Sequence, residues 1–154
     1  MSHWYTRLLL GVLLCSCSLT LLAQPVSGQE KTLVADETAK TKLLGKHRFS
    51  VQWISWDRFG SALITEKNGL LSIKGEQRLP NSSDFLTMDG IITKVESRRF
   101  TFKGKIVIQC KEIYDTPCVR EGEMTFIITG NRKYWRLQQM QTCNDTTDYV
   151  DIFF

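Results

Sequence analysis

The chain contains 154 residues, of which 42% are hydrophobic and 23% are charged, and its formal net charge is +4. This length suits a single domain with one hydrophobic core. Charges of both signs are interspersed and no long basic run occurs, so the composition argues against a nucleic-acid-binding protein.

The first stretch is typical of an export signal rather than of a folded domain. Arg7 precedes an apolar run over residues 8–23, and small residues follow at 26–28. A basic start, an apolar middle and small residues at the cut define a secretory signal peptide. The run is also shorter than the ~20 apolar residues that a membrane-spanning helix needs. We therefore expect residues 1–28 to be removed and the protein to be secreted or periplasmic.

An alternative reading of the same stretch concerns Cys17. The sequence Leu14-Cys15-Ser16-Cys17 resembles a bacterial lipobox, in which the chain is cut just before a cysteine that then carries lipid. In that case the mature protein would be a membrane-anchored lipoprotein. Under the first reading, no contact with a membrane is expected.

Residues 29–45 predict a flexible N-terminal segment that contains a short helix. Asp36 is a suitable N-cap for this helix, and Gly45 a suitable end. From residue 46 onward apolar and polar residues alternate, which predicts β-strands. A β-barrel-like domain is therefore expected over residues 46–154.

Several strands of this domain are predicted by local patterns. Phe49, Val51 and Trp53 alternate with polar residues in the first strand. Asn68-Gly69 is the strongest short signal for a β-hairpin, and it would place Ile64 opposite Ile73. Gly90 indicates a bend or bulge in a later strand. The last strand lies within Thr147–Phe154.

Residues 118–143 predict one long hairpin whose turn is Gly130-Asn131. In that register Phe126 faces Trp135, and Cys118 faces Cys143 at a site without backbone hydrogen bonds between the pair. Such sites bring the side chains closest and favour a cross-strand disulfide. The competing pairing is Cys110–Cys118, and in the favoured pairing Cys110 remains as a buried thiol.

The elements add up to an all-β fold of about eight antiparallel strands that are mostly neighbours in sequence. We expect an eight-stranded up-and-down meander barrel, or a strongly curled sheet close to one, with a short N-terminal helix. Pairing of the last strand with the first would close the barrel.

These features resemble the lipocalin and avidin group of small β-barrels. The resemblance rests on the short helix, on Leu44-Gly45-Lys46, on an aromatic first strand, and on Tyr134-Trp135-Arg136-Leu137. It is architectural and covers roughly residues 44–154. It implies that a small hydrophobic ligand binds in the barrel mouth.

Residues for catalysis are scarce. His47 is the single histidine after the signal peptide, and the sequence contains neither a metal-ligand pair nor a phosphate-binding glycine loop nor a nucleophile elbow. The sequence therefore predicts a non-enzymatic protein without catalytic residues, cofactor or metal. Its expected partner is a small hydrophobic ligand or a protein of the cell envelope.

Two interpretations of the aromatic residues remain open. If a hydrophobic ligand binds, we expect Trp53, Trp56 and Trp135 to contact it and Arg136 to orient its polar end. Alternatively, the inward-facing rings simply fill the narrow interior of an eight-stranded barrel. The protein would then be a structural or interaction component of the envelope, with an exposed patch around Trp56 and Phe59.

Overall fold

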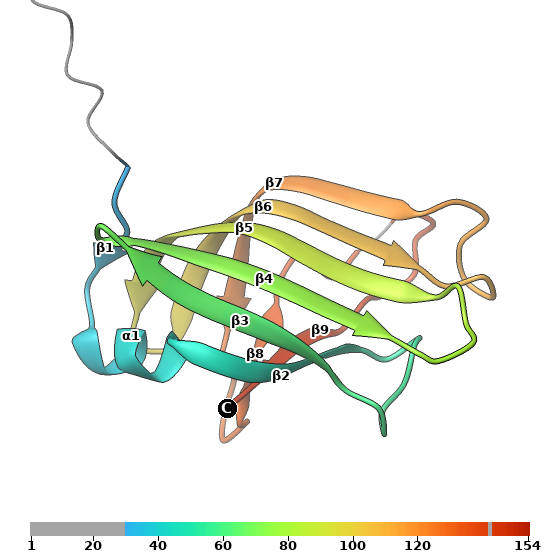
Figure 1. The fold of residues 1–154 in the computed structure, drawn as a ribbon, viewed down its shortest axis with the longest axis horizontal. Coiled ribbons are helices and arrows are strands. Elements are labelled where there is room, and N and C mark those ends of the chain that lie inside the picture. Colours follow the sequence, from blue (N-terminus) through green and yellow to red (C-terminus); the bar gives the residue numbers. More distant parts are fainter. Residues whose placement is uncertain (1–29, 142) are drawn as a thin grey trace, which may run out of the picture.

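The structure is a computed structural model, and it describes residues 30–141 and 143–154. The predicted signal peptide and Cys17 lie outside the described residues. Within the described part the chain forms nine strands and one helix (Figure 1). In chain order these are β1 (Leu33–Val34), α1 (Glu37–Leu43), β2 (Gly45–Val51), β3 (Gly60–Lys67), β4 (Leu70–Arg78), β5 (Phe85–Glu96), β6 (Arg99–Gln109), β7 (Cys118–Ile127), β8 (Tyr134–Leu137) and β9 (Val150–Phe153).

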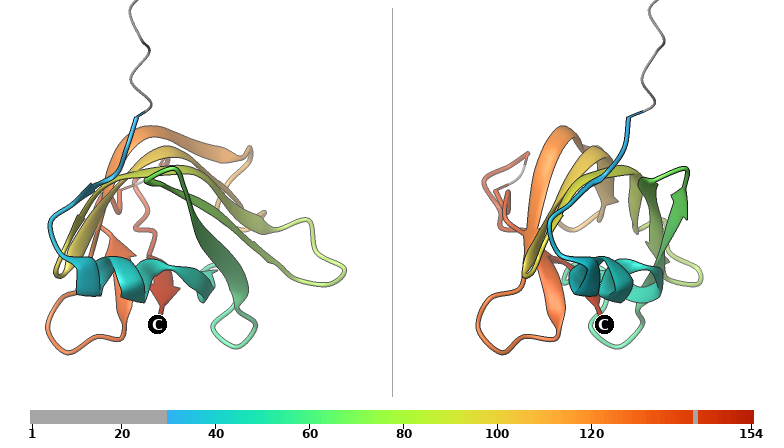
Figure 2. Two further views of the ribbon diagram at one scale, coloured as in Figure 1. Left: turned by 60° about the vertical axis from the view of Figure 1, so that its left-hand side comes forward. Right: turned by 90° about the vertical axis from the view of Figure 1, so that its left-hand side faces the viewer.

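The strands β2 to β9 form a closed antiparallel barrel, which confirms the predicted fold. Each of these strands pairs with its neighbour in sequence, and β9 pairs with β2 to close the sheet. The closing pair joins the last and first strands of the barrel, as predicted, and its register places Phe49 opposite Ile152 and Val51 opposite Val150. β1 is an additional strand that runs parallel to the end of β5. Figure 2 shows the sheet curling round on itself in an end-on view.

The helix α1 forms as predicted and covers one end of the barrel. Asp36 caps it by accepting a hydrogen bond of 2.9 Å from the backbone N–H of Ala39. Gly45 follows with a φ of +106°, a conformation that favours glycine. Ala39 and Leu43 are buried against the core. Figure 2 shows the helix lying across the lower part of this end.

The segment before α1, for which the sequence predicts flexibility, lies along the barrel. The hydroxyl of Thr32 donates to the carbonyl oxygen of Ile92 at 2.6 Å and accepts from the N–H of Leu71 at 2.8 Å. Ala35 donates its N–H to the carbonyl oxygen of Val95. These bonds seat β1 where the register of β5 shifts, between Ile92 and Lys94. The bulge of β5 therefore lies here, and of the two features predicted for Gly90, a bend or a bulge, the bulge is not found there.

A row of glycines permits the tight curvature of the sheet. Gly90, Gly104 and Gly122 are cross-strand partners on β5, β6 and β7. A Cβ atom added to Gly104 would lie 2.3 Å from the carbonyl oxygen of Asp89 and 2.7 Å from the ring of Phe102. Such distances are far inside van der Waals contact, so the strands approach this closely only because side chains are absent.

One predicted hairpin has the expected register and the other does not. Ile64 pairs with Ile73 across Asn68-Gly69, as predicted. In the second hairpin Phe126 pairs with Leu137 instead of Trp135, so the predicted register was wrong by two residues. The register differs because the connection between β7 and β8 spans residues 128–133, whereas the prediction assumed a two-residue turn. β8 ends at Leu137.

The Cys118–Cys143 disulfide is present, although the predicted reason for it does not hold. The two Cα atoms are 5.8 Å apart, within the usual range for a disulfide. Cys143 lies in the long connection between β8 and β9, outside any strand. The bond therefore fastens this connection to the start of β7. Cys110 is a buried free cysteine.

Aromatic rings fill the centre of the barrel. The largest fully buried side chains include Phe49, Phe100, Phe102, Phe126 and Trp135. Phe100 and Phe126 stack in parallel with centroids 4.9 Å apart, and Phe100 meets Trp135 edge-on at 6.0 Å. Trp53 was predicted on the first strand, but β2 ends at Val51 and Trp53 is half-buried beyond it.

Candidate functional site

The outer surface of β2, β9 and β8 carries a cluster that we call the arginine–aromatic face. The strand registers place Phe153 beside Arg48 and Tyr134, and Asp151 beside Ser50 and Arg136. Loop residues at both sides extend the cluster. The face consists of Arg48, Phe59, Tyr134, Arg136, Tyr149 and Phe153.

Its first row is a stack of rings around one arginine. The guanidinium of Arg48 lies 4.7 Å from the ring centre of Phe59 and 5.3 Å from that of Phe153. The rings of Phe59 and Phe153 meet edge to face with their centroids 5.1 Å apart. The centroid of the Phe153 ring also lies 5.2 Å from that of Tyr134. Each cation–ring contact at an exposed site is worth about 0.5–1 kcal/mol. These contacts therefore hold the side chains of the row in place.

The second row contains a carboxylate buried on the outside of the barrel. Arg136 donates two hydrogen bonds to Asp151, at 2.8 and 2.6 Å, and this bond raises the pKa of the arginine. The same guanidinium lies 4.2 Å from the ring centre of Tyr149 and 5.0 Å from that of Tyr134. Asp151 is only 1% exposed as a result. Beside it, the hydroxyl of Ser50 is buried without a hydrogen-bond partner among the described residues.

An open hollow of about 500 Å³ adjoins the first row. Its lining includes the cations Lys46 and Arg48, the ring of Phe59, the hydroxyl of Ser61 and the carboxylate of Glu76. Glu76 is itself paired with Arg78. The hollow thus offers an aromatic wall and positive charge, a combination that is common where proteins recognise one another.

The sequence-predicted ligand residues lie in different settings. Trp135 is 2% exposed inside the barrel, whereas its neighbour Arg136 points to the outer surface. Trp53 lies at the end of the barrel opposite α1, and Trp56 is 53% exposed in the connection from β2 to β3. The structure does not gather these four side chains around one site, and their contact with a ligand stays a prediction.

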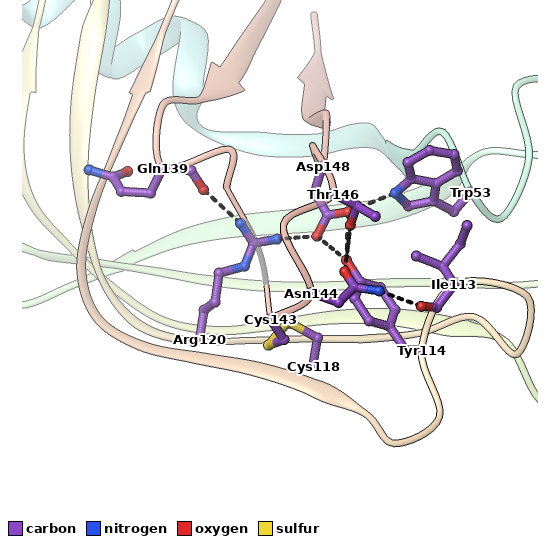
Figure 3. The surroundings of a disulfide bond; sticks show 10 residues. All are labelled: Trp53, Ile113, Tyr114, Cys118, Arg120, Gln139, Cys143, Asn144, Thr146 and Asp148. Atoms are coloured by element: carbon purple, nitrogen blue, oxygen red, sulfur yellow. Dashed lines mark hydrogen bonds and ion pairs between the residues drawn. A yellow bond between two sulfur atoms is a disulfide. The ribbon is translucent and has the colours of Figure 1, made fainter.

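A buried carboxylate organises the end of the barrel opposite α1 (Figure 3). Asp148 is fully buried. It accepts hydrogen bonds from the indole N–H of Trp53 at 2.7 Å, from the hydroxyl of Tyr114 at 2.9 Å, and from Arg120 at 2.8 Å. Burial raises the pKa of Asp148, and these three donors oppose that rise. No local pattern in the sequence indicates this cluster, because the partners of Asp148 lie far away along the chain.

The donors of Asp148 come from three different segments. Trp53 follows β2, Tyr114 lies between β6 and β7, and Arg120 is part of β7. Figure 3 shows them converging beside the Cys118–Cys143 bond. Both carboxylate oxygens of Asp148 are occupied, so we interpret the cluster as the closure of this barrel end rather than as a reactive site.

His47 lies between α1 and β9. Nε2 of His47 lies 2.8 Å from the carbonyl oxygen of Leu43, and Nδ1 lies 3.2 Å from that of Phe153. The ring is 9% exposed and ties α1 to β9. Among the described residues, no group of three or more histidine, cysteine, aspartate or glutamate side chains could hold a metal ion.

Comparisons with known proteins place the chain in one family. The model of the PM1083 family matches residues 31–154, which is the whole barrel together with β1 and α1. A protein of Pasteurella multocida (strain Pm70), described as "Uncharacterized protein PM1083", is 40% identical over 139 residues, covering 88% of this chain and 90% of its own length. No solved structure matches the chain.

Proposed function

The chain belongs to the PM1083 family, and from that premise we propose that it is an exported, non-enzymatic barrel that acts through its outer surface. In this proposal it is an interaction component of the cell envelope, and the arginine–aromatic face binds its partner. The observation that carries the proposal is the contrast between a barrel interior filled with rings and an outer face where rings and arginines are gathered.

The filled interior supports action from the outside. Five large rings occupy the centre of the barrel and are at most 2% exposed. Leu43 of α1 covers one end, and the cluster around Asp148 covers the other. An eight-stranded barrel has an interior just wide enough for its own side chains. A ligand inside would have to displace rings that already pack against one another.

The outer face differs from the rest of the barrel surface. On the strands from β4 to β7, opposite charges pair across the sheet, as in Lys74 with Asp89 at 3.0 Å and Lys105 with Glu121 at 3.9 Å. Such a surface is well solvated. On these strands Arg78 also stacks on a ring, that of Phe85. On β2, β9 and β8 the guanidinium groups of Arg48 and Arg136 each contact two rings. Arginine and aromatic residues are enriched where proteins bind partners.

Export is supported by the disulfide. Cys118 and Cys143 are bonded, and structural disulfides persist mainly in oxidising compartments. A search of the described residues finds no helix with the length and apolar character needed to cross a membrane.

A site-specific crosslinking experiment tests the face. A photoreactive amino acid at Tyr149, which lies on the face, should give a discrete crosslinked product in the native host. The same amino acid at Lys103, which is exposed on β6, should not. Adding Arg48→Ser, which breaks the first row, should weaken the product from position 149. Equal products from both positions, or none from position 149, would contradict the proposal.

A small hydrophobic ligand remains the second candidate, supported by the exposed ring of Trp56 beside the barrel end. Saturable quenching of tryptophan fluorescence by apolar compounds, lost in Trp56→Ser, would favour it over the first. The absence of any response across a varied panel would remove it.

A further inference from the structure

A second hollow, at the end of the barrel that α1 covers, concentrates positive charge. It has a volume of about 290 Å³. Its cationic lining comes from three elements: Lys42 from α1, Arg98 from the turn between β5 and β6, and Arg132 with Lys133 from the connection between β7 and β8. Four basic side chains from three segments that are distant in sequence thus meet around one small space.

These four cations lack carboxylate partners. None of them forms an ion pair with a carboxylate among the residues that the structure describes. Among the described residues that line the hollow, there is no aspartate or glutamate either. Elsewhere on α1 a lysine does find a partner, since Lys40 pairs with Glu66 at 2.9 Å. Unpaired like charges around one hollow repel one another, and a bound anion would relieve that repulsion.

Several of the charges are held in position without any ligand. Arg98 donates from Nε and Nη2 to the carbonyl oxygen of Ile128, and from Nη2 to that of Gly130. The ammonium of Lys42 lies 4.3 Å from the ring centre of Phe154, and the guanidinium of Arg132 lies 5.6 Å from that of Tyr134. Less side-chain entropy is therefore lost when an anion binds.

We propose that this basic hollow binds a phosphate group, either on a soluble molecule or on a lipid headgroup. A phosphate carries up to two negative charges and several strong acceptor oxygens, which suits four donors better than a single carboxylate does. Guanidinium groups match phosphate oxygens in geometry. The volume exceeds that of a lone ion and admits the group to which the phosphate is attached. This site adjoins the arginine–aromatic face at Tyr134, on which Arg132 stacks, but it does not depend on the function proposed for that face.

The test uses the mature protein, glycerol phosphate as a soluble probe, and vesicles of phosphatidylglycerol or phosphatidylcholine. Calorimetry should detect saturable binding of the soluble probe, or cosedimentation should detect binding to the phosphatidylglycerol vesicles alone. Binding of the soluble probe would show that a phosphate group on a soluble molecule is sufficient for binding to the hollow. Binding to anionic vesicles alone identifies a lipid headgroup as the source. Both results support the site, and both should weaken as salt concentration rises.

Two double variants make the test specific. Arg132→Gln with Lys133→Gln removes two charges from the hollow and should weaken binding roughly tenfold or more, because charge-assisted contacts are lost. Lys103→Gln with Lys111→Gln removes two exposed charges elsewhere and should leave binding unchanged. Equal losses in both variants would show general attraction to a basic protein and would overturn the proposal. So would the failure of the unaltered protein to bind either probe. Unchanged melting temperatures confirm that both variants fold.

Discussion

Arg98 and Ile128 are joined by hydrogen bonds in both directions between two turns at the same end of the barrel. The N–H of Ile128 donates to the backbone carbonyl oxygen of Arg98 at 2.8 Å, and the guanidinium of Arg98 donates back to the carbonyl oxygen of Ile128 at 3.1 Å. These bonds draw Ile128 toward the β5–β6 turn and away from β8. They explain why the β7–β8 connection is long and why the pairing differs by two residues from that of a two-residue turn.

Removing this guanidinium should destabilise the protein moderately. In Arg98→Ala the carbonyl oxygens of Ile128 and Gly130 lose their donor, which should lower the free energy of unfolding by about 1–2 kcal/mol. Urea denaturation measures the change. Arg99→Ala is the control, because Arg99 is exposed and its ion pair with Glu96 is 3.7 Å long; there we expect less than about 0.5 kcal/mol. Equal effects would mean that the bonds to Ile128 contribute little.

The buried carboxylate at the other end should be far more sensitive. Asp148→Ala leaves the guanidinium of Arg120 and the indole N–H of Trp53 without their acceptor, so we expect a loss of about 3–5 kcal/mol. Denaturation followed by tryptophan fluorescence measures it. Asp145→Asn is the control: the position is exposed in the same connection, its φ is +60°, and asparagine tolerates that conformation, so stability should change little. A loss below about 1 kcal/mol in Asp148→Ala would contradict the role given to the cluster.

The raised pKa of Asp148 also predicts the direction of a pH effect. Burial favours the protonated form, so this group stabilises the fold most below its ordinary value of 3.8. That contribution is lost as pH rises through the raised pKa. As pH rises just above 3.8, the unfolding free energy of the unaltered protein should therefore fall relative to that of Asp148→Asn. A shift in the opposite sense would show that the three donors outweigh burial.

A methyl group at the glycine row should be poorly tolerated. In Gly104→Ala the new Cβ meets the backbone of Asp89 and Gly90 at 2.3 and 2.6 Å, and backbone cannot move aside as a flexible side chain does. We expect destabilisation of about 3 kcal/mol, at the upper end for overpacking. Thermal denaturation measures it. Lys103→Ala, next to it and exposed, should stay within about 0.5 kcal/mol. A mild effect at Gly104 would mean that the strands can separate there at little cost.

Opening the disulfide should loosen the β8–β9 connection. Cys118 and Cys143 are 25 residues apart in the chain, and replacing both by serine should lower stability by about 2–4 kcal/mol. Cys110 gives an independent readout. It is 3% exposed, and burial raises the pKa of its thiol, so it should react with a thiol reagent only when the protein unfolds. Rapid labelling of Cys110 in the native protein would contradict its placement.

The parts of the fold that follow from local patterns were predictable. Alternation of apolar and polar residues identified the strands, Asn68-Gly69 identified a hairpin with its register, and Asp36 identified the start of α1. The number of strands and their sequential order were enough to suggest a closed barrel, because a long meander without edges has few other solutions.

The parts that depend on distant contacts were not predictable. Arg98 and Ile128 are 30 residues apart, and nothing near Gly130-Asn131 indicates that a remote arginine controls the turn. Asp148 and Trp53 are 95 residues apart. The arginine–aromatic face was missed for a related reason. Its rows depend on the register of β9 against β2 and β8. The connection between β8 and β9 is long and irregular, so the sequence does not indicate which residues of β9 lie opposite those of β2 and β8.

The pairing of β9 with β2 has a consequence for how the chain folds while it is being made. The carbonyl oxygen of Phe153 meets the ring of His47, which precedes it by 106 residues in the chain. A chain that is synthesised from its N-terminus presents β2 early and β9 last. Until β9 emerges, β2 and β8 both have unpaired backbone edges, which attract other strands. The barrel can therefore close only after its last strand is available, and until then the open sheet is prone to self-association.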